Sequence, residues 1–266
     1  MLSTTLSTDD LEILFTYELC SYPPALFDSH ALPLEANKAN LADALWTRTK
    51  KVNNSEHTGR VAHVLDGGSL LHRVPWHQSE TCDHICSRYI NYIQERYKDN
   101  SPVTIVFDGY SKGSNAKDVT HMRRSRALGP DVTFTGVMHC QLKKDEFLSN
   151  HRNKEKFIYF LGAHLEECNY SVMYAEADTD VLIVKTVVES SHHIDTVLVR
   201  DDTDLLVLLI HHFPSLHDVY FKPEVKQNAT KDPKTWDIKK TQQALGENIR
   251  DNTLFIHAFL GCDCSE

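Results

Sequence analysis

The sequence predicts an α/β protein with three layers, α/β/α, in which helices cover both faces of a central, twisted and mostly parallel sheet. Two observations lead to this class. Short apolar runs alternate with segments of helical periodicity from residue 59 onward, which is typical of β-α-β units. The apolar runs are nearly continuous, as expected for strands that are covered on both faces. With 266 residues, the chain is long enough to bury a sizeable core.

The first 58 residues are expected to form a helical N-terminal extension. One helix is expected to begin near residue 9 and to end at Pro23 and Pro24, because proline does not continue a helix. A second helix is expected over residues 37–51, with basic residues near its C-terminal end. The polar segment 52–60 indicates a domain boundary, so that residues 59–266 form the main domain.

The main domain alternates expected strands and helices. The strands are expected at residues 60–66, 102–108, 133–138, 170–175, 195–200 and 218–223. The helices are expected at residues 83–97, 154–169 and 181–190. In the first helix, Ile85, Tyr89 and Ile93 recur on one face. The third segment is ambiguous between helix and strand, and we prefer a helix because a strand is expected on each side of it.

Four of the expected strands end in aspartates. These residues are Asp66, Asp108, the pair Asp178 and Asp180, and the pair Asp202 and Asp204. The carboxyl ends of parallel strands lie along one edge of a sheet, where ligands bind in open α/β folds. We therefore expect the four groups to meet at that edge, and Asp263 to join them from the end of a final helix.

Such a cluster of carboxylates favours a metal site. Carboxylates within ~4–6 Å of each other raise one another's pKa, and they stay ionised together only when a cation neutralises them. Oxygen ligands suit Mg²⁺ or Mn²⁺, and a cluster of this size can hold two ions, which together activate water for phosphodiester hydrolysis. The alternative for any single residue is a turn former or a helix N-cap. We interpret Asp201 as such a cap.

A basic segment follows Asp108 and supports nucleic acid as the partner. It contains Lys112, Lys117, Arg123, Arg124 and Arg126. If it leads into a helix beside the acidic edge, it offers cations to phosphates. A solvated helix face is the alternative interpretation of the same segment.

The order of these motifs resembles the PIN-like 5′-nuclease superfamily, which includes flap endonucleases and 5′→3′ exoribonucleases. The matching segments are VLDGGSLLH for the first strand and its aspartate, VFDGY and the basic stretch for the second aspartate and the arch, EADTD for the E-x-E pair, DDTDLL for the D-x-D pair, and FLGCDC for the L-G-C-D segment. The last two are the most specific. The resemblance covers residues 60–266. The sequence of the chain also resembles a group of transposon-derived animal proteins with this domain.

The resemblance implies a nuclease that uses two Mg²⁺ or Mn²⁺ ions on DNA or RNA. The metal ligands that it implies are Asp66, Asp108, Asp178, Asp180, Asp202, Asp204 and Asp263. The catalytic set that it implies contains Asp66 and Asp108 with Lys117, Arg123 and Arg124, which would orient the scissile phosphate. The register of EADTD leaves two choices, Glu176 with Asp178 or Asp178 with Asp180, and we prefer the second because it repeats the spacing of the D-x-D pair.

Two features depart from the family. In flap endonucleases the first aspartate lies close to the N-terminus, whereas about sixty residues precede Asp66 here. The family also continues past G-C-D into a helical DNA-binding element, which the domain of residues 59–266 is expected to lack because the sequence ends at Glu266. The alternative function is therefore a catalytically inactive PIN-like fold that binds nucleic acid or protein.

Composition narrows the remaining classes. A net charge of −9 argues against a protein that coats nucleic acid non-specifically. Seven cysteines without a framework spacing fit a reducing compartment, so we expect an intracellular protein of the nucleus or cytoplasm. No apolar run is long enough for a membrane helix. A structural zinc site at Cys82, His84 and Cys86 is disfavoured because four ligands are needed, and an aspartate-nucleophile phosphatase is disfavoured by Gly68, where a second acid would stand.

Overall fold

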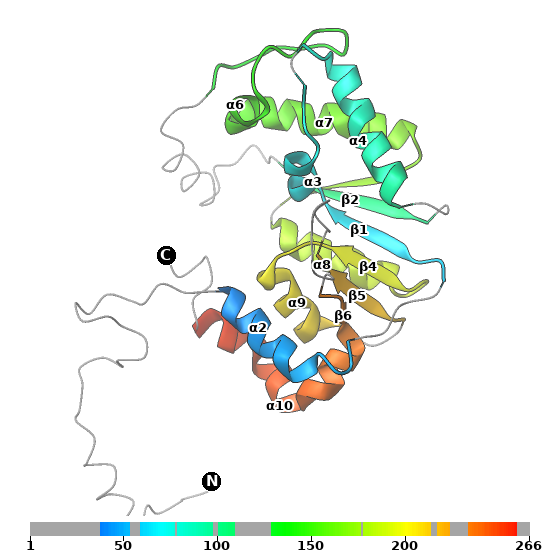
Figure 1. Ribbon diagram of the computed structural model, residues 1–266, viewed down its shortest axis with the longest axis vertical. Coiled ribbons are helices and arrows are strands. Elements are labelled where there is room, and N and C mark those ends of the chain that lie inside the picture. The colour runs from blue at the N-terminus through cyan, green and yellow to red at the C-terminus, as the bar shows by residue number, and fades with distance from the viewer. Residues whose placement is uncertain are drawn as a thin grey trace, which may run out of the picture.

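The computed structural model describes residues 38–53, 59–77, 79–97, 101–109, 129–176, 178–213, 217–223 and 234–259. These residues form an α/β fold around one six-stranded sheet of order β3-β2-β1-β4-β5-β6 (Figure 1). Neighbouring strands are parallel except for the β5–β6 pair, which is antiparallel. The predicted α/β class with a mostly parallel sheet is thus confirmed.

The strands carry the apolar runs of the sequence. They are β1 Ala62–Asp66, β2 Val103–Asp108, β3 Ser171–Ala175, β4 Thr196–Val199, β5 Val219–Lys222 and β6 Trp236–Asp237. In the register, Asp66 pairs with Val106, and Asp108 pairs with Ala175. The carboxyl ends of β1, β2 and β3 therefore lie along the same edge of the sheet.

The helices alternate with the strands along most of the chain. They are α2 Lys38–Thr49, α3 Gly67–Arg73, α4 Cys82–Arg96, α6 Lys144–Ser149, α7 His151–Glu167, α8 Thr179–Ser190, α9 Thr203–His212 and α10 Ile238–Phe259. Several begin at a side-chain cap, because the first N–H groups of a helix need acceptors. Asn150, for example, accepts from the N–H groups of Arg152 and Asn153 at the start of α7.

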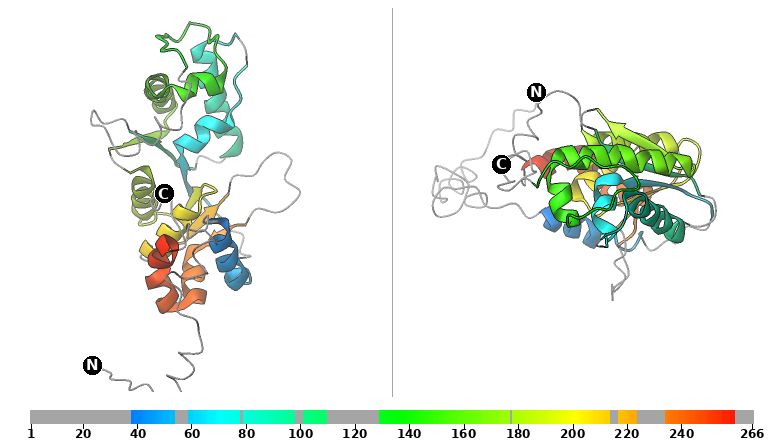
Figure 2. Two further views of the ribbon diagram at one scale, coloured as in Figure 1. Left: turned by 90° about the vertical axis from the view of Figure 1, so that its left-hand side faces the viewer. Right: turned by 90° about the horizontal axis from the view of Figure 1, so that it is seen from above.

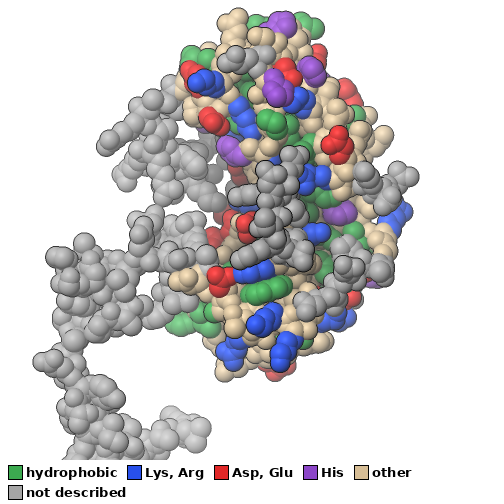
Figure 3. Space-filling model, viewed as in Figure 1, with side chains coloured by type: hydrophobic (Ala, Val, Ile, Leu, Met, Phe, Trp, Pro, Cys, Tyr) green, Lys and Arg blue, Asp and Glu red, His purple; other side chains and the backbone are tan. Residues whose placement is uncertain are grey.

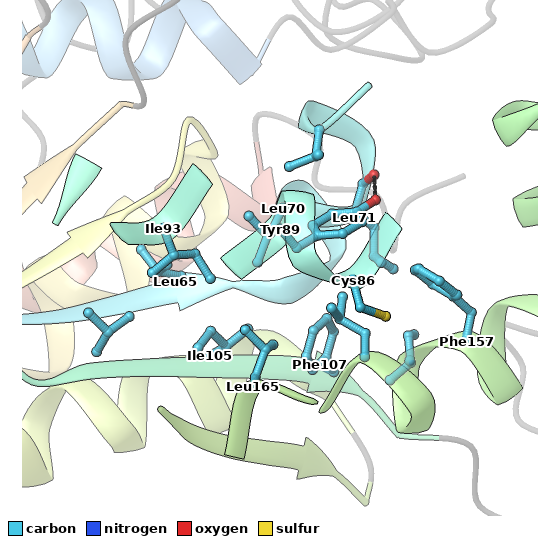
Figure 4. Packing of buried hydrophobic residues seen from close by; sticks show 14 of the residues in the cluster. Leu65, Leu70, Leu71, Cys86, Tyr89, Ile93, Ile105, Phe107, Phe157 and Leu165 are labelled. Atoms are coloured by element: carbon cyan, nitrogen blue, oxygen red, sulfur yellow. Dashed lines mark hydrogen bonds between the residues drawn. The ribbon is translucent and has the colours of Figure 1, made fainter. Parts of the chain in front are cut away.

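One face of the sheet is covered by α3, α4, α6 and α7. Leu65, Ile105 and Phe107 point to this side and belong to one apolar cluster with fully buried Tyr89 and Phe157 (Figure 4). Because strand side chains alternate between the two faces, the residues beside them in the strands point the other way. The helices α4, α6 and α7 gather at one end of the molecule, as Figures 1 and 2 show.

The opposite face is covered by α2, α8, α9 and α10. Val64, Val106 and Leu198 point to this side and belong to a second apolar cluster. Helix α2 contributes Leu45 to this cluster, and the ring of Trp46 lies 4.9 Å from that of Trp236. The layer order is therefore helix, sheet, helix, and α2 packs onto the same core as the helices that follow it.

The strand expected at residues 133–138 is wrong. The structure has no strand there, although Thr81 and His139 form an isolated antiparallel bridge. The N–H groups of Cys82 and Asp83 donate to the carbonyls of Met138 and Gly136, so the segment is tied to the start of α4 and not to the sheet.

The helix expected from residue 9 lies outside the described residues. Among the helices that the structure describes, none combines the length and the apolar character needed to span a bilayer.

Candidate active site

Acids from three separate parts of the chain face one pocket at the carboxyl edge of the sheet. Asp66 is the last residue of β1, Asp108 is the last residue of β2, and Asp180 lies in the first turn of α8 after β3. The pocket has a volume of about 220 Å³. It is lined by Asp66, Gly68, Ser69, His72, Asp108, Thr179, Asp180 and Arg200.

Three of the predicted ligands are helix N-caps. The Oδ1 atom of Asp66 accepts from the Ser69 N–H at 3.0 Å, starting α3. Asp178 and Asp202 accept in the same way from the N–H groups two residues later, each at 2.9 Å. The interpretation of Asp201 as a cap is wrong, since Asp202 caps α9 and Asp201 is exposed. In Asp66 and Asp202 the cap uses Oδ1, and Oδ2 makes a second contact.

Arg200 makes that second contact for two of the caps. The residue follows β4, and its guanidinium forms ion pairs with Oδ2 of Asp66 and, at 3.2 Å, with Oδ2 of Asp202. The end of β1 and the start of α9 are thus joined through one cation.

Asp108 is held by two other groups. The hydroxyl of Thr179 donates to Oδ1 of Asp108, and the Lys154 ammonium lies 3.4 Å from Oδ2. Thr179 belongs to α8 and Lys154 to α7, so helices on opposite faces of the sheet both reach the end of β2.

The electrostatics of the pocket centre on Asp66, whose side chain is only 7% exposed. Burial raises the pKa of the Asp66 carboxyl, because a charged group loses hydration there. Arg200 and the Ser69 N–H lower it in part, and the negative charge of Asp108 raises it further. Asp66 therefore stays charged in this site only at an energetic cost, which Arg200 and the Ser69 N–H partly offset.

Three other predicted ligands, Asp178, Asp202 and Asp204, are described by the structure and do not line this pocket. Asp178 and Asp202 serve as caps, and Asp204 contacts His257 of α10 at 2.8 Å. Glu176 is exposed. The structure therefore brings together Asp66, Asp108 and Asp180, and it connects Asp202 to them through Arg200. Asp263, Lys117, Arg123 and Arg124 fall outside the described residues.

A scan against protein-family models and a search of curated proteins both find no match to this chain.

The pocket offers oxygen donors, the type of ligand atom that a hard divalent ion prefers. Three carboxylates and the hydroxyls of Ser69 and Thr179 supply oxygen atoms, which are the ligands of Mg²⁺ and Mn²⁺. As the side chains lie, no three Asp, Glu, His or Cys residues of the described ranges form a group that could hold an ion. Two of the acids are instead paired with Arg200 and Lys154. An ion on Asp66 or Asp108 would compete with these cations.

Sequence reasoning assigned no role to Arg200, Lys154 or His72. Together they place basic groups beside the acids, and Figure 3 shows Lys, Arg and His side chains next to Asp and Glu along the middle of the molecule. A signal existed for Arg200, which is a cation directly before an acidic run. None existed for Lys154, which lies 46 positions from its partner Asp108.

Proposed function

We propose that this chain is a divalent-metal-dependent nuclease of the PIN-like type, which hydrolyses phosphodiester bonds in DNA or RNA. The observation that carries the proposal is the meeting of Asp66, Asp108 and Asp180 in one pocket. A helix cap needs one acid at its own helix start. Capping gives no reason for Asp108 and Asp180 to face the same space as Asp66, whereas metal binding does.

The residues of the pocket have separate roles in this proposal. Asp66, Asp108 and Asp180 would hold the ions, which when bound supply an activated water and neutralise the leaving oxygen. Thr179 fixes the orientation of the Asp108 carboxylate through its hydrogen bond. Lys154 and His72 stand at the acidic pocket as cationic or hydrogen-bonding groups for the non-bridging oxygens of a phosphate.

The residues implied by the resemblance complete the proposal. Lys117, Arg123 and Arg124 would hold the phosphate backbone from the segment after Asp108, and Asp263 would add a carboxylate. These roles rest on the resemblance alone.

A cleavage assay on the full chain tests the proposal. The substrates are flapped DNA and 5′-phosphorylated RNA, each with Mg²⁺, with Mn²⁺ or with EDTA. We expect metal-dependent cleavage that Asp180→Asn lowers by about 100-fold or more, as for the loss of one preorganised charged group in an active site. Asp180 is chosen because it lines the pocket without being a helix cap.

The matched control is Asp201→Asn, which removes the same charge from an exposed acid near the same edge. It should cleave like the unaltered chain. Equal cleavage by the Asp180 variant, or cleavage that persists in EDTA, would count against the proposal.

One observation favours the alternative of a binding module. Arg200, Lys154 and His257 already pair with Asp66, Asp108 and Asp204, which is the state expected if the acids had only a structural role. A module of this kind would bind 5′-phosphorylated oligonucleotides without cleaving them, and Asp180→Asn would leave the affinity unchanged or raise it.

A further inference from the structure

Arg200 occupies a fixed position between two acids of the candidate site. Its N–H donates to the carbonyl of Lys222 at 3.0 Å, so the backbone continues the pairing of β4 with β5. The side chain is 26% exposed and lines the pocket. The guanidinium can therefore change partners without any movement of the sheet.

The contacts of Arg200 use the oxygens that the helix caps leave available. Oδ1 of Asp66 and Oδ1 of Asp202 accept from the N–H groups of Ser69 and Asp204. Oδ2 of each residue then pairs with a different nitrogen of Arg200. A planar guanidinium has several donors in a fixed fork, which suits it to two carboxylates at once.

A divalent ion would need the same oxygens. Oδ1 of Asp66 accepts from the Ser69 N–H, so an ion that binds Asp66 through Oδ2, or through both oxygens, meets the Arg200 guanidinium at Oδ2. Two cations on one carboxylate oxygen repel each other at short distance, so each binds that oxygen more weakly than it would alone. Binding of the ion is therefore coupled to release of the arginine.

We propose that Arg200 is an internal competitor for the divalent ion: it neutralises Asp66 and Asp202 when no ion is bound, and the ion displaces it. The inference rests on the proposed function in so far as it takes Asp66 to be a metal ligand. Displacement frees the guanidinium within the pocket, where it becomes available to a substrate phosphate. Metal and phosphate would then assist each other's binding, since each removes a partner that hinders the other.

The test is a titration with Mn²⁺ alone, in which the free ion is followed by electron paramagnetic resonance on the full chain after treatment with chelator. We expect Arg200→Gln to bind Mn²⁺ at least about tenfold more tightly than the unaltered chain, because one charge-assisted competitor is gone. The control Arg250→Gln removes the same charge from an arginine that pairs with exposed Asp251, and its affinity should stay within about twofold of the unaltered chain. Equal or weaker binding by Arg200→Gln would overturn the inference.

A second variant covers the case in which Arg200→Gln does not fold. Arg200→Lys keeps the charge but lacks the fork that reaches both carboxylates, so it should bind Mn²⁺ more tightly than the unaltered chain, by a smaller factor. Unchanged affinity in this variant would also overturn the inference.

The outcomes separate this inference from the proposed function. If all variants bind Mn²⁺ equally and the unaltered chain cleaves its substrates, the proposed nuclease function stands and the role of Arg200 as a competitor is overturned. Tight Mn²⁺ binding by Arg200→Gln, without cleavage by the unaltered chain, supports the competitor and counts against the nuclease. Absence of binding in every variant overturns both.

Discussion

The Nε2 atom of His257 lies 2.8 Å from Oδ1 of Asp204, which joins the last turns of α10 to the first turn of α9. The imidazole is nearly buried and the carboxylate partly so. A hydrogen bond that involves a carboxylate in such surroundings is stronger than an exposed one. Helix α10 is therefore fastened to the acidic edge of the sheet as well as to the apolar core.

Replacing His257 with alanine should weaken this connection. We expect the free energy of unfolding to fall by about 1–3 kcal/mol, because the hydrogen bond and the packing of the ring are both lost. Urea denaturation followed by circular dichroism measures the change. Glu247→Ala alters an exposed position of α10 and should shift the free energy by less than about 0.5 kcal/mol. Equal midpoints for the two variants would contradict the expected role of His257.

Replacing Gly67 or its neighbour Gly68 with alanine should have different effects on the stability of the chain. A Cβ at Gly67 would lie 2.2 Å from a ring carbon of Phe107, which is fully buried and has no room to shift. Gly67→Ala should therefore destabilise the chain by about 1–3 kcal/mol. A Cβ at Gly68 would lie 3.1 Å from Oδ1 of Asp66 and 3.9 Å from Oδ2 of Asp108, inside the pocket.

Gly68→Ala should consequently leave thermal stability near that of the unaltered chain, since alanine also favours the helix. By narrowing the pocket it should lower the proposed nuclease activity. Melting curves and the cleavage assay measure the two effects. If the Gly67 variant is as stable as the Gly68 variant, the ring of Phe107 can move to make room for the added methyl group, and the expected clash is wrong.

The hydroxyl of Tyr89 connects α3, α4 and the segment between them. It donates to the carbonyl of Leu71 at 2.8 Å, a bond drawn in Figure 4, and accepts from the indole N–H of Trp76 at 2.9 Å. Tyr89→Phe keeps the ring and leaves both partners without this bond, so we expect a loss of about 1–3 kcal/mol in chemical denaturation. Tyr159→Phe, at a partly exposed position of α7, is the matched control, and a similar loss there would argue against the hydrogen bonds as the cause.

The pKa of His72 should be lower in the folded chain than its ordinary value of about 6.5. Partial burial at the pocket lowers it first, and the charges of Lys144 and Lys154 lower it further. As pH falls through 6.5, the unfolded chain takes up this proton before the folded chain does, so stability is lost between 6.5 and the folded pKa and stays level below it.

Denaturation between pH 7.5 and 5 should show this loss in the unaltered chain, and His72→Gln should remove that part of the pH dependence. Nuclear magnetic resonance titration of the imidazole gives the pKa directly. Lys144→Gln should raise the pKa of His72, and a decrease in that variant would contradict the assigned cause.

The sheet was accessible from sequence because its strands are local apolar runs. The expected ranges around β1, β2, β3, β4 and β5 each contain the observed strand. Segment 133–138 resembled them but has another role: Phe134 packs against the rings of Phe147 and Phe160, and the segment is not part of the sheet that the described residues form. The alternation of residue types in a sequence does not show whether a segment packs against helices or pairs with a strand.

Some helices were missed for comparable reasons. Helix α3 begins with two glycines, which disfavour a helix, and its start depends on the cap made by Asp66. Helix α9 is so apolar that its periodicity is hidden.

The acids of the site could be found from sequence because they follow strands, whereas their partners could not. The pairs Asp66–Arg200, Asp108–Lys154 and Asp204–His257 join residues that are 134, 46 and 53 positions apart. Only the folded chain brings them together.

The three capping aspartates also bear on how the chain would change over evolutionary time. Serine, threonine and asparagine start helices about as well as aspartate does, so folding alone would accept a neutral residue at Asp66, Asp178 and Asp202. A lineage without need of the charge would be free to drift toward those neutral residues. This chain has the acid at all three positions, and at Asp66 the carboxylate is buried beside the negative charge of Asp108, a cost that helix initiation does not require.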